Sequence, residues 1–342
     1  MVKGCIVGAG RISELHAAAY KNNKSAELCA VCDINEERAN AFADKFGIKN
    51  IYTSFEEMLE KEKDLDALDV CVWNKEHASK SVAALERGLN VLCEKPMAIS
   101  LAEAERMTEA AKKNGKLLMI AQVKRFSNEC AVARDMIESG ALGSIYHSRA
   151  FYLRRCGNPG GWFADKSLSG GGPVIDIGIH NLDLCRYLMG CPKATSVYAI
   201  THRNSVRQSK NDACTVEDYA AAIIKYENGA TTLFETSYNL NGRNDLRSAE
   251  VYGSEGGIII DDKLTLYNQV GGHMMTSSLA DVSLDKLDAQ KANVNFQNEI
   301  NHFIDCIENN TPCISDAEDA LENMRIIDAL YMSAETGREI TL

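Results

Sequence analysis

The sequence lacks an apolar run long enough to cross a membrane, and it lacks an excess of positive charge. Its 342 residues carry a formal net charge of −11, which argues against nucleic acid as a partner. It shows no internal repeat, no low-complexity segment and no pattern of a signal peptide. These absences predict a cytoplasmic protein with no nucleic-acid or membrane partner, and the length of 342 residues predicts two domains.

Disulfide and metal-binding patterns are also missing, although the chain has 12 cysteines. Cys29 and Cys32 have redox-motif spacing, but they lie along an expected strand rather than at a helix start, which favours core residues. Because no second pair and no histidine cluster accompany them, we expect no metal site. Other cysteines in expected strands and helices are interpreted as buried, reduced thiols, among them Cys5, Cys71, Cys93 and Cys185.

A glycine turn follows the first expected strand, residues 2–7, and precedes a helical pattern at 13–20. The first glycine permits a tight turn, and the second lets a pyrophosphate approach the backbone at the helix N-terminus. Ser13 stands where a third glycine is usual. The turn therefore predicts the first βα unit of a dinucleotide-binding fold, with cofactor contacts from Gly8, Gly10, Arg11 and Ile12.

Asp33 ends the second expected strand, 23 positions beyond Gly10. An acid at about this distance hydrogen-bonds the ribose of NAD and repels the 2′-phosphate of NADP. The alternative is an aspartate that caps the following helix. We predict a preference for NAD, and Arg38 lies close enough in sequence to offset part of the repulsion.

Strands and helices then alternate, which predicts a doubly wound parallel sheet. Ser54 with Glu57, and Ser100 with Glu103, form capping-box patterns, and glycines follow two helix ends at 88 and 115. The expected strands are 67–72, 90–93 and 116–123, and the expected helices are 55–61, 77–87 and 101–113. Cofactor contacts should cluster at the carboxyl ends of the strands.

Glu94-Lys95-Pro96 stands at one such strand end. A lysine beside a nicotinamide stabilises a developing alkoxide or polarises a carbonyl oxygen. The peptide bond before Pro96 can be either cis or trans. The alternative for Glu94 and Lys95 is a solvated ion pair in a turn.

The segment from Gly170 to Asp183 reads GGGPVIDIGIHNLD. The three glycines suggest a flexible lead-in, and the proline suits a first helical turn. On a helix Asp176, His180 and Asp183 share one face among apolar neighbours. A carboxylate beside an imidazole on a largely buried helix suits proton transfer. The alternatives are a solvated polar stripe or a buried histidine satisfied by its neighbour.

Together these motifs resemble the glucose–fructose oxidoreductase/inositol dehydrogenase (Gfo/Idh/MocA) family over nearly the whole chain. The resemblance implies a Rossmann domain, taken as residues 1–123, and a domain with an open, mostly antiparallel sheet, residues 124–342, for substrate binding and oligomerisation. It also implies Lys95, Asp176 and His180 as the catalytic set. It adds Asn74, His77 and Glu94 to the expected cofactor contacts. Trp73 departs from the proline common in such proteins.

The second half supports this architecture independently. Residues 219–226 and 230–238 flank an Asn-Gly turn, as in a β-hairpin, and 250–252 with 258–260 suggest another. The polar stretches 202–217 and 268–295 are interpreted as loops. Helices are expected at 296–309 and 316–336. Such a sheet leaves a face that helices do not cover, so we expect a homodimer or homotetramer.

The predicted substrate is a sugar derivative or a cyclitol, oxidised at a hydroxyl-bearing carbon with NAD. His180 takes the hydroxyl proton, Lys95 stabilises the oxygen, and Asp176 either orients His180 or binds a neighbouring hydroxyl. Further substrate contacts are expected from Arg125, Arg154, Arg155 and Trp162; surface salt bridges and core packing are the alternatives. Two other functions stay open: a glycosidase that oxidises its sugar transiently, and a non-catalytic NAD(H) sensor.

Overall fold

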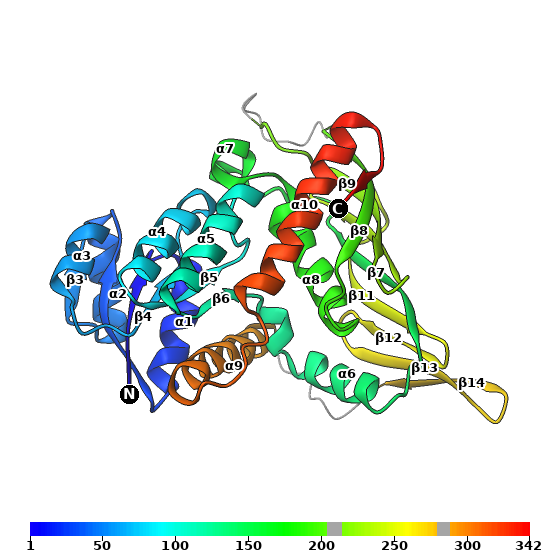
Figure 1. Ribbon diagram of the computed structural model, residues 1–342, viewed down its shortest axis with the longest axis horizontal. Helices are drawn as coiled ribbons and strands as arrows, with labels where there is room; N and C mark the ends of the chain where they lie inside the picture. Colours follow the sequence, from blue (N-terminus) through cyan, green and yellow to red (C-terminus); the bar gives the residue numbers. More distant parts are fainter. Residues whose placement is uncertain (204–213, 279–287) are drawn as a thin grey trace. The chain divides into compact units, whose positions relative to one another are not determined.

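The computed structural model describes residues 1–203, 214–278 and 288–342 (Figure 1). The chain divides into two compact units. Unit 1 contains Met1–Phe126 and Asp288–Leu321, and unit 2 contains Ser127–Leu287 and Glu322–Leu342. The division falls inside helix α10 (Ala317–Thr336). The domain boundary expected at residue 123 stays a prediction.

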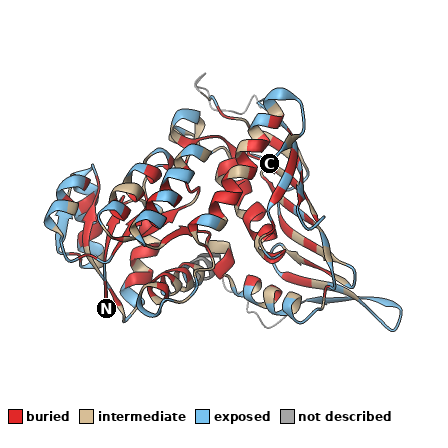
Figure 2. Cartoon of the chain, in the orientation of Figure 1, coloured by how far each residue is buried: buried red, intermediate tan, exposed pale blue. Residues whose placement is uncertain are grey.

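Unit 1 is built on a six-stranded sheet whose paired strands all run parallel. The order is β3-β2-β1-β4-β5-β6, which confirms the predicted doubly wound fold. Most of its residues are buried, as expected for strands covered on both faces (Figure 2). The strands are β1 (Val2–Val7), β2 (Ala26–Cys32), β3 (Asn50–Tyr52), β4 (Ala67–Val70), β5 (Asn90–Glu94) and β6 (Leu118–Ala121).

The ends of the helices that connect these strands lie within two residues of the predicted ends, except that the helix expected at 77–87 begins at Asn74. The Ser54 and Ser100 hydroxyls accept the backbone N–H groups of Glu57 and Glu103, so both predicted caps are confirmed. Gly115 ends one of these helices with φ +60°. The helices are α1 (Arg11–Asn22), α2 (Glu36–Phe46), α3 (Phe55–Lys61), α4 (Asn74–Glu86) and α5 (Leu101–Asn114), with the short η1 (Val123–Phe126) after β6.

Helix α9 (Asp288–Asn309) is distant in sequence from the rest of unit 1, yet it completes the core of that unit. Its buried side chains Ile300, Phe303 and Ile304 pack in one cluster with Tyr20 of α1 and Val2 of β1. Figure 1 shows α9 lying beside α1. The sequence predicted a helix at 296–309, which is shorter than α9, and it did not predict that this helix packs on α1.

Unit 2 is built on a nine-stranded, mostly antiparallel sheet, as predicted. The order is β14-β13-β12-β11-β7-β10-β9-β8-β15, and β7 with β10 is the parallel pair among the described strands. Both predicted hairpins are confirmed, as β9 with β10 and β11 with β12. The strands are β7 (Ile145–Leu153), β8 (Ala194–His202), β9 (Tyr219–Tyr226), β10 (Thr231–Ser237), β11 (Leu246–Gly253), β12 (Gly256–Ile260), β13 (Leu264–Val270), β14 (His273–Ser278) and β15 (Ile340–Thr341).

The prediction of a loop at 268–295 is wrong for most of the residues in this range that the structure describes. β13 continues to Val270, Gly271 and Gly272 turn the chain with positive φ, and β14 pairs antiparallel with β13. Every residue of β14 is exposed, so this edge strand lacks the apolar alternation by which strands are recognised. Residues 279–287 lie outside the described residues, and α9 begins at Asp288.

The loop expected at 202–217 is confirmed only in part, because residues 204–213 lie outside the described residues and β8 ends at His202. The helices of unit 2 are α6 (Asn128–Glu138), η2 (Gly161–Ala164), α7 (Lys166–Ser169), η3 (Val174–Gly178), α8 (Ile179–Leu188) and the larger part of α10. Among described residues, no helix combines the length and the hydropathy needed to cross a membrane.

Candidate active site

The glycine turn after β1 has the geometry its sequence predicts. Gly8 has φ +93°, and a Cβ there would lie 2.2 Å from the carbonyl oxygen of Cys71. Apart from residues next to Gly10 in the chain, no atom of the described residues lies within 4 Å of the corresponding position there, so the backbone is open to a ligand. Helix α1 begins at the next residue, and the Ser13 hydroxyl donates to the Gly10 carbonyl over 2.6 Å. A glycine-lined helix N-terminus of this kind suits a pyrophosphate.

Asp33 follows β2 and braces the same turn. Its carboxylate accepts the backbone N–H groups of Ala9 and Asn35, both over 2.8 Å. The Arg38 guanidinium lies 3.8 Å from it. The N-cap of α2 is Asn35, so the alternative that Asp33 caps this helix is wrong. The buried acid therefore lies beside the glycine turn, where a ribose-binding carboxylate is expected.

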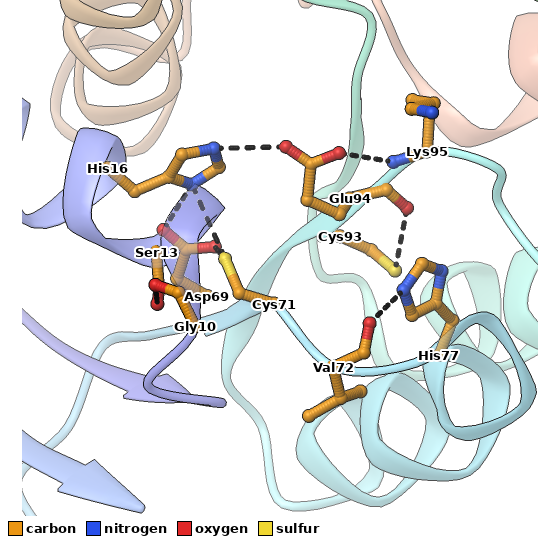
Figure 3. A network of polar contacts seen from close by, with 10 residues as sticks. All are labelled: Gly10, Ser13, His16, Asp69, Cys71, Val72, His77, Cys93, Glu94 and Lys95. Carbon is orange, nitrogen blue, oxygen red and sulfur yellow. Dashed lines mark hydrogen bonds and ion pairs between the residues drawn. The ribbon is translucent and has the colours of Figure 1, made fainter. Parts of the chain in front are cut away.

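Glu94 and Lys95 do not form a solvated pair. Glu94 is 8% exposed, and its carboxylate accepts the backbone N–H of Lys95 over 3.0 Å. Figure 3 shows the other carboxylate oxygen facing the ring of His16, at 3.2 Å from Nε2. The peptide bond between Lys95 and Pro96 is cis. The Glu94 side chain thus anchors the backbone from which Lys95 projects.

His16 stands at the centre of a buried network that the sequence analysis missed. Its Nδ1 lies 2.8 Å from Asp69 Oδ2, and the Cys71 thiol donates to Asp69 Oδ1 over 3.3 Å (Figure 3). Burial lowers the pKa of His16, but Asp69 and Cys71 raise it more, to well above its ordinary value. Both ring nitrogens face carboxylates, as an imidazolium requires. An aspartate inside the apolar strand β4 was the available sequence signal.

His77 supports the turn after β5 from the other side. Its side chain is buried, with Nδ1 2.7 Å from the Pro96 carbonyl oxygen and Nε2 3.1 Å from that of Val72. Burial lowers the pKa of His77. Asn74 begins α4 and is also buried, whereas Trp73 before it is half exposed. These contacts give His77 a role in shaping the Lys95 turn, and cofactor contacts from Asn74 and His77 stay predictions.

The helix with Asp176 and His180 begins with a π turn, a feature that the sequence analysis did not predict. η3 is π-helical, and the Ile179 N–H donates to the Val174 carbonyl, five residues back. Gly178 allows this packing, because a Cβ there would lie 2.5 Å from the Phe234 ring. The α-helical turns start only at Ile179. A π turn of this kind is frequent at functional sites.

Asp176 and His180 are both half-buried, one in the π turn and the other in the first turn of α8. The hydroxyl of the fully buried Tyr238 donates to Asp176 over 2.8 Å. Burial, together with Asp176, raises the pKa of Tyr238, so this hydroxyl keeps its proton. Asp183 differs from Asp176, since it is fully buried and accepts from the Asn323 amide over 2.7 Å.

The glycines before this helix permit close packing rather than flexibility, so the flexible lead-in is wrong. A Cβ at Gly171 would lie 2.0 Å from the Tyr331 hydroxyl, and one at Gly172 would lie 2.1 Å from the Glu217 carbonyl oxygen. The Glu217 carboxylate accepts the N–H groups of Gly172 and Val174 and the Tyr331 hydroxyl. It therefore satisfies backbone donors at the helix start.

The predicted substrate contacts differ in their surroundings. Arg154 donates to the Tyr152 hydroxyl and the Gly157 carbonyl. Burial lowers its pKa, but Tyr152 and Asp176 raise it more. Arg155 is exposed, and its backbone N–H donates to Asp245.

Trp162 stacks on Phe163 with ring centroids 3.8 Å apart. Arg125, in unit 1, is buried and donates to the Ile314 carbonyl and to Asp319, each over 2.5 Å. These contacts give Arg125 a structural role. Substrate binding by Arg125, Arg154, Arg155 and Trp162 stays a prediction.

The chain is similar to known proteins over its whole length. Residues 2–122 match the family described as "Oxidoreductase family, NAD-binding Rossmann fold", and residues 134–342 match "Oxidoreductase family, C-terminal alpha/beta domain". D-glucoside 3-dehydrogenase of Escherichia coli is 34% identical, over 98% of this chain and 96% of its own length. scyllo-Inositol 2-dehydrogenase (NAD(+)) of Bacillus subtilis is 29% identical over 100% and 96%.

The fold recurs in solved structures. Levoglucosan dehydrogenase in complex with NADH has a TM-score of 0.88 at 24% identity, over 99% of this chain and 98% of that one. Aldose-aldose oxidoreductase from Caulobacter crescentus has a TM-score of 0.84 at 26% identity, over 100% and 99%. The two family matches, the 34% identity and the shared fold show that the chain belongs to the Gfo/Idh/MocA family of NAD(P)-dependent oxidoreductases.

Proposed function

We propose that this protein oxidises one CH–OH group of a sugar derivative or a cyclitol, with NAD as hydride acceptor. The observation that carries the proposal is the half-buried pair Asp176 and His180 at the π-to-α junction, with Tyr238 holding the carboxylate. Relatives that span the chain are named as a glucoside dehydrogenase and an inositol dehydrogenase. A ring that carries several hydroxyl groups is the substrate class they share.

The residues of unit 1 fit a dinucleotide. Gly8 and Gly10 leave the backbone open at the start of α1, where the N–H groups of Arg11 and Ile12 would take the pyrophosphate. Asp33 would accept the ribose hydroxyls, and its charge would disfavour a 2′-phosphate. When bound, the nicotinamide supplies a two-electron hydride acceptor. We therefore infer a preference for NAD over NADP.

The protein's own residues would manage the proton and the charge on oxygen. His180 removes the proton of the substrate hydroxyl as a general base. Lys95 would stabilise the substrate oxygen with its ammonium group as negative charge develops there and the C–H bond breaks. Asp176 is fixed by the Tyr238 hydroxyl, so its second oxygen can orient His180 or accept a neighbouring substrate hydroxyl.

Lys95 depends in turn on its supports in unit 1. Glu94 holds the backbone N–H of Lys95, and His16 holds Glu94 from the opposite side. His77 contacts the carbonyl of Pro96. We infer that these three residues position Lys95 and do not react themselves. The buried His16 network would therefore preorganise the Lys95 side chain.

A substrate screen tests the proposal. Purified protein is incubated with NAD and a panel of hexosides, free sugars and inositols, and both NADH and the oxidised product are quantified. We expect stoichiometric NADH with at least one member of the panel. Cleavage of a glycoside without accumulation of NADH would instead indicate redox-neutral glycosidase chemistry. NAD binding without any turnover would indicate a sensor.

A further inference from the structure

Three soft or borderline metal-ligand groups meet in unit 1, on α9 and in the connection that follows it. His302 and Cys306 lie one helical turn apart on α9, and Cys313 follows that helix in the connection to α10. Their potential ligand atoms all lie within 4.8 Å of one another. The distance between Cys306 Sγ and His302 Nε2 is 3.4 Å. We call this set the thiol–imidazole cluster.

The connection that carries Cys313 is held in place on both sides. Asn310 has a positive φ of 54° just after α9, and the side chains of Asn309 and Thr311 both donate to Asp305. Further along, the Ser315 hydroxyl donates to the Ile120 carbonyl over 2.6 Å. These contacts hold Cys313 near α9. Binding of a metal ion would therefore require little further ordering of the connection.

The imidazole is in the form that binds a metal. The backbone N–H of Ile314 donates to His302 Nε2 over 3.1 Å, so Nε2 carries a lone pair and the proton resides on Nδ1. An incoming ion would take this lone pair in place of the amide. Cys306 is buried, whereas His302 and Cys313 are half-buried, which leaves a route to solvent.

We propose that His302, Cys306 and Cys313 bind one zinc ion. Two thiolates and a neutral imidazole are typical zinc ligands, and a water would complete a tetrahedron. The ion would tie the end of α9 to the connection that leads into α10, which makes it a structural site independent of the dehydrogenase reaction. The spacing H-x3-C-x6-C contains no CxxC pair, and for this reason the sequence alone predicted no metal site.

A second group, His16, Asp69 and Cys71, also satisfies the distance criterion. All three of its side chains are fully or almost fully buried. Its imidazole lies between two carboxylates and has a raised pKa, so it is a cation rather than a metal ligand. Of the two groups, the thiol–imidazole cluster is therefore the better zinc site.

Cobalt titration tests the proposal on full-length, reduced, tag-free protein. We expect one equivalent of Co²⁺ to produce cysteine-to-cobalt charge-transfer absorption, which Zn²⁺ then abolishes. Cys313→Ser and His302→Gln should each lower the affinity for Co²⁺ by at least roughly 10–100-fold. Loss of a residue that only hydrogen-bonds a metal ligand already costs that much. Cys156→Ser, which changes an exposed cysteine outside the cluster, should bind as the wild type does.

Alkylation followed by mass spectrometry of the wild type gives a second readout that needs no variant. Zn²⁺ should slow alkylation of Cys306 and Cys313 by at least roughly tenfold and leave Cys156 unaffected. Absence of cobalt–thiolate absorption, or unchanged alkylation with Zn²⁺, would overturn the proposal. So would a Cys306–Cys313 disulfide that forms in preference to the metal complex. None of these readouts depends on a substrate.

Discussion

At the residue scale, we expect Asp33 to determine the choice between NAD and NADP. Replacing it with serine removes the charge that opposes a 2′-phosphate, and it releases Arg38, which lies 3.8 Å away. We expect Asp33→Ser to narrow the ratio of kcat/KM for NAD to that for NADP by roughly tenfold or more, a difference of about 1.4 kcal/mol. The matched double variant, Asp33→Ser with Arg38→Ala, should lose most of the increase in kcat/KM for NADP that Asp33→Ser produces. Equal efficiency of the wild type with both cofactors would contradict this assignment.

The buried carboxyl group of Glu299 is expected to make the unfolding free energy of the protein depend on pH. It is fully buried in α9, and within the described residues neither carboxyl oxygen has a hydrogen-bond partner. Burial raises its pKa well above 4.5. The folded protein therefore keeps a proton that the unfolded chain releases above about pH 4.5, so this group lowers stability as pH rises towards its folded-state pKa.

The variant Glu299→Gln removes that titration. Its Tm should exceed the wild-type Tm by roughly 2–4 °C at pH 8, as about 1 kcal/mol would give, and by less at pH 5. Glu105→Gln, an exposed change in the same unit, serves as the control and should show no such trend. Scanning calorimetry between these pH values measures both. A Tm difference independent of pH would show that Glu299 does not hold a proton in the folded protein.

The sequence identifies single candidate site residues where a motif fixes their place along the chain. Asp33 is found because it stands at a set distance beyond Gly10, and Lys95 because it follows a strand end. The network of His16, Asp69 and Glu94 could not be found this way. Its members come from α1, β4 and β5, and they meet only after packing brings the elements together.

At the scale of elements, Glu217 supports the start of the π turn. Its carboxylate accepts two backbone N–H groups and the Tyr331 hydroxyl. Glu217→Ala leaves these donors without their acceptor and should cost roughly 2–4 kcal/mol of unfolding free energy. Glu217→Gln keeps one acceptor oxygen and should cost less. Urea denaturation of both variants measures these losses of unfolding free energy. An alanine variant as stable as the wild type would refute the capping role.

Elements with a regular pattern are predicted closely. The expected helix at 55–61 coincides with α3, and the first strand coincides with β1. Prediction fails where tertiary packing determines the conformation. In the π turn, Gly178 packs so closely on Phe234 that a Cβ would not fit, and β14 pairs with β13 although its side chains are all exposed.

At the scale of the whole molecule, an uncovered apolar patch on the unit 2 sheet predicts self-association. Tyr198 and Ile223 lie directly opposite each other on β8 and β9 and are 47% and 50% exposed, and Ile200 beside them is 43% exposed. Their neighbours Val197 and Ile224 are fully buried, so the exposed side chains share the other face of the sheet. A patch of this kind suits a two-fold interface.

We expect light scattering at micromolar concentration to give two or four times the chain mass of 37.5 kDa. Ile223→Lys should lower that mass, because it places a charge in the patch. Glu227→Lys, which changes charge in an exposed turn, should leave the mass unchanged. A monomeric wild type would rule out this interface.

The catalytic assignment of His180 and Lys95 is the central claim, and one set of measurements on the same preparations tests it. For His180→Ala we expect kcat to fall by roughly 10²–10⁴-fold, with NAD affinity and Tm close to those of the wild type. Lys95→Ala should also lose most of its kcat, and the double variant should lose less than the product of the two effects, because both groups act in one step. A His180→Ala protein that is stable, binds NAD and turns over at the wild-type rate would contradict the account.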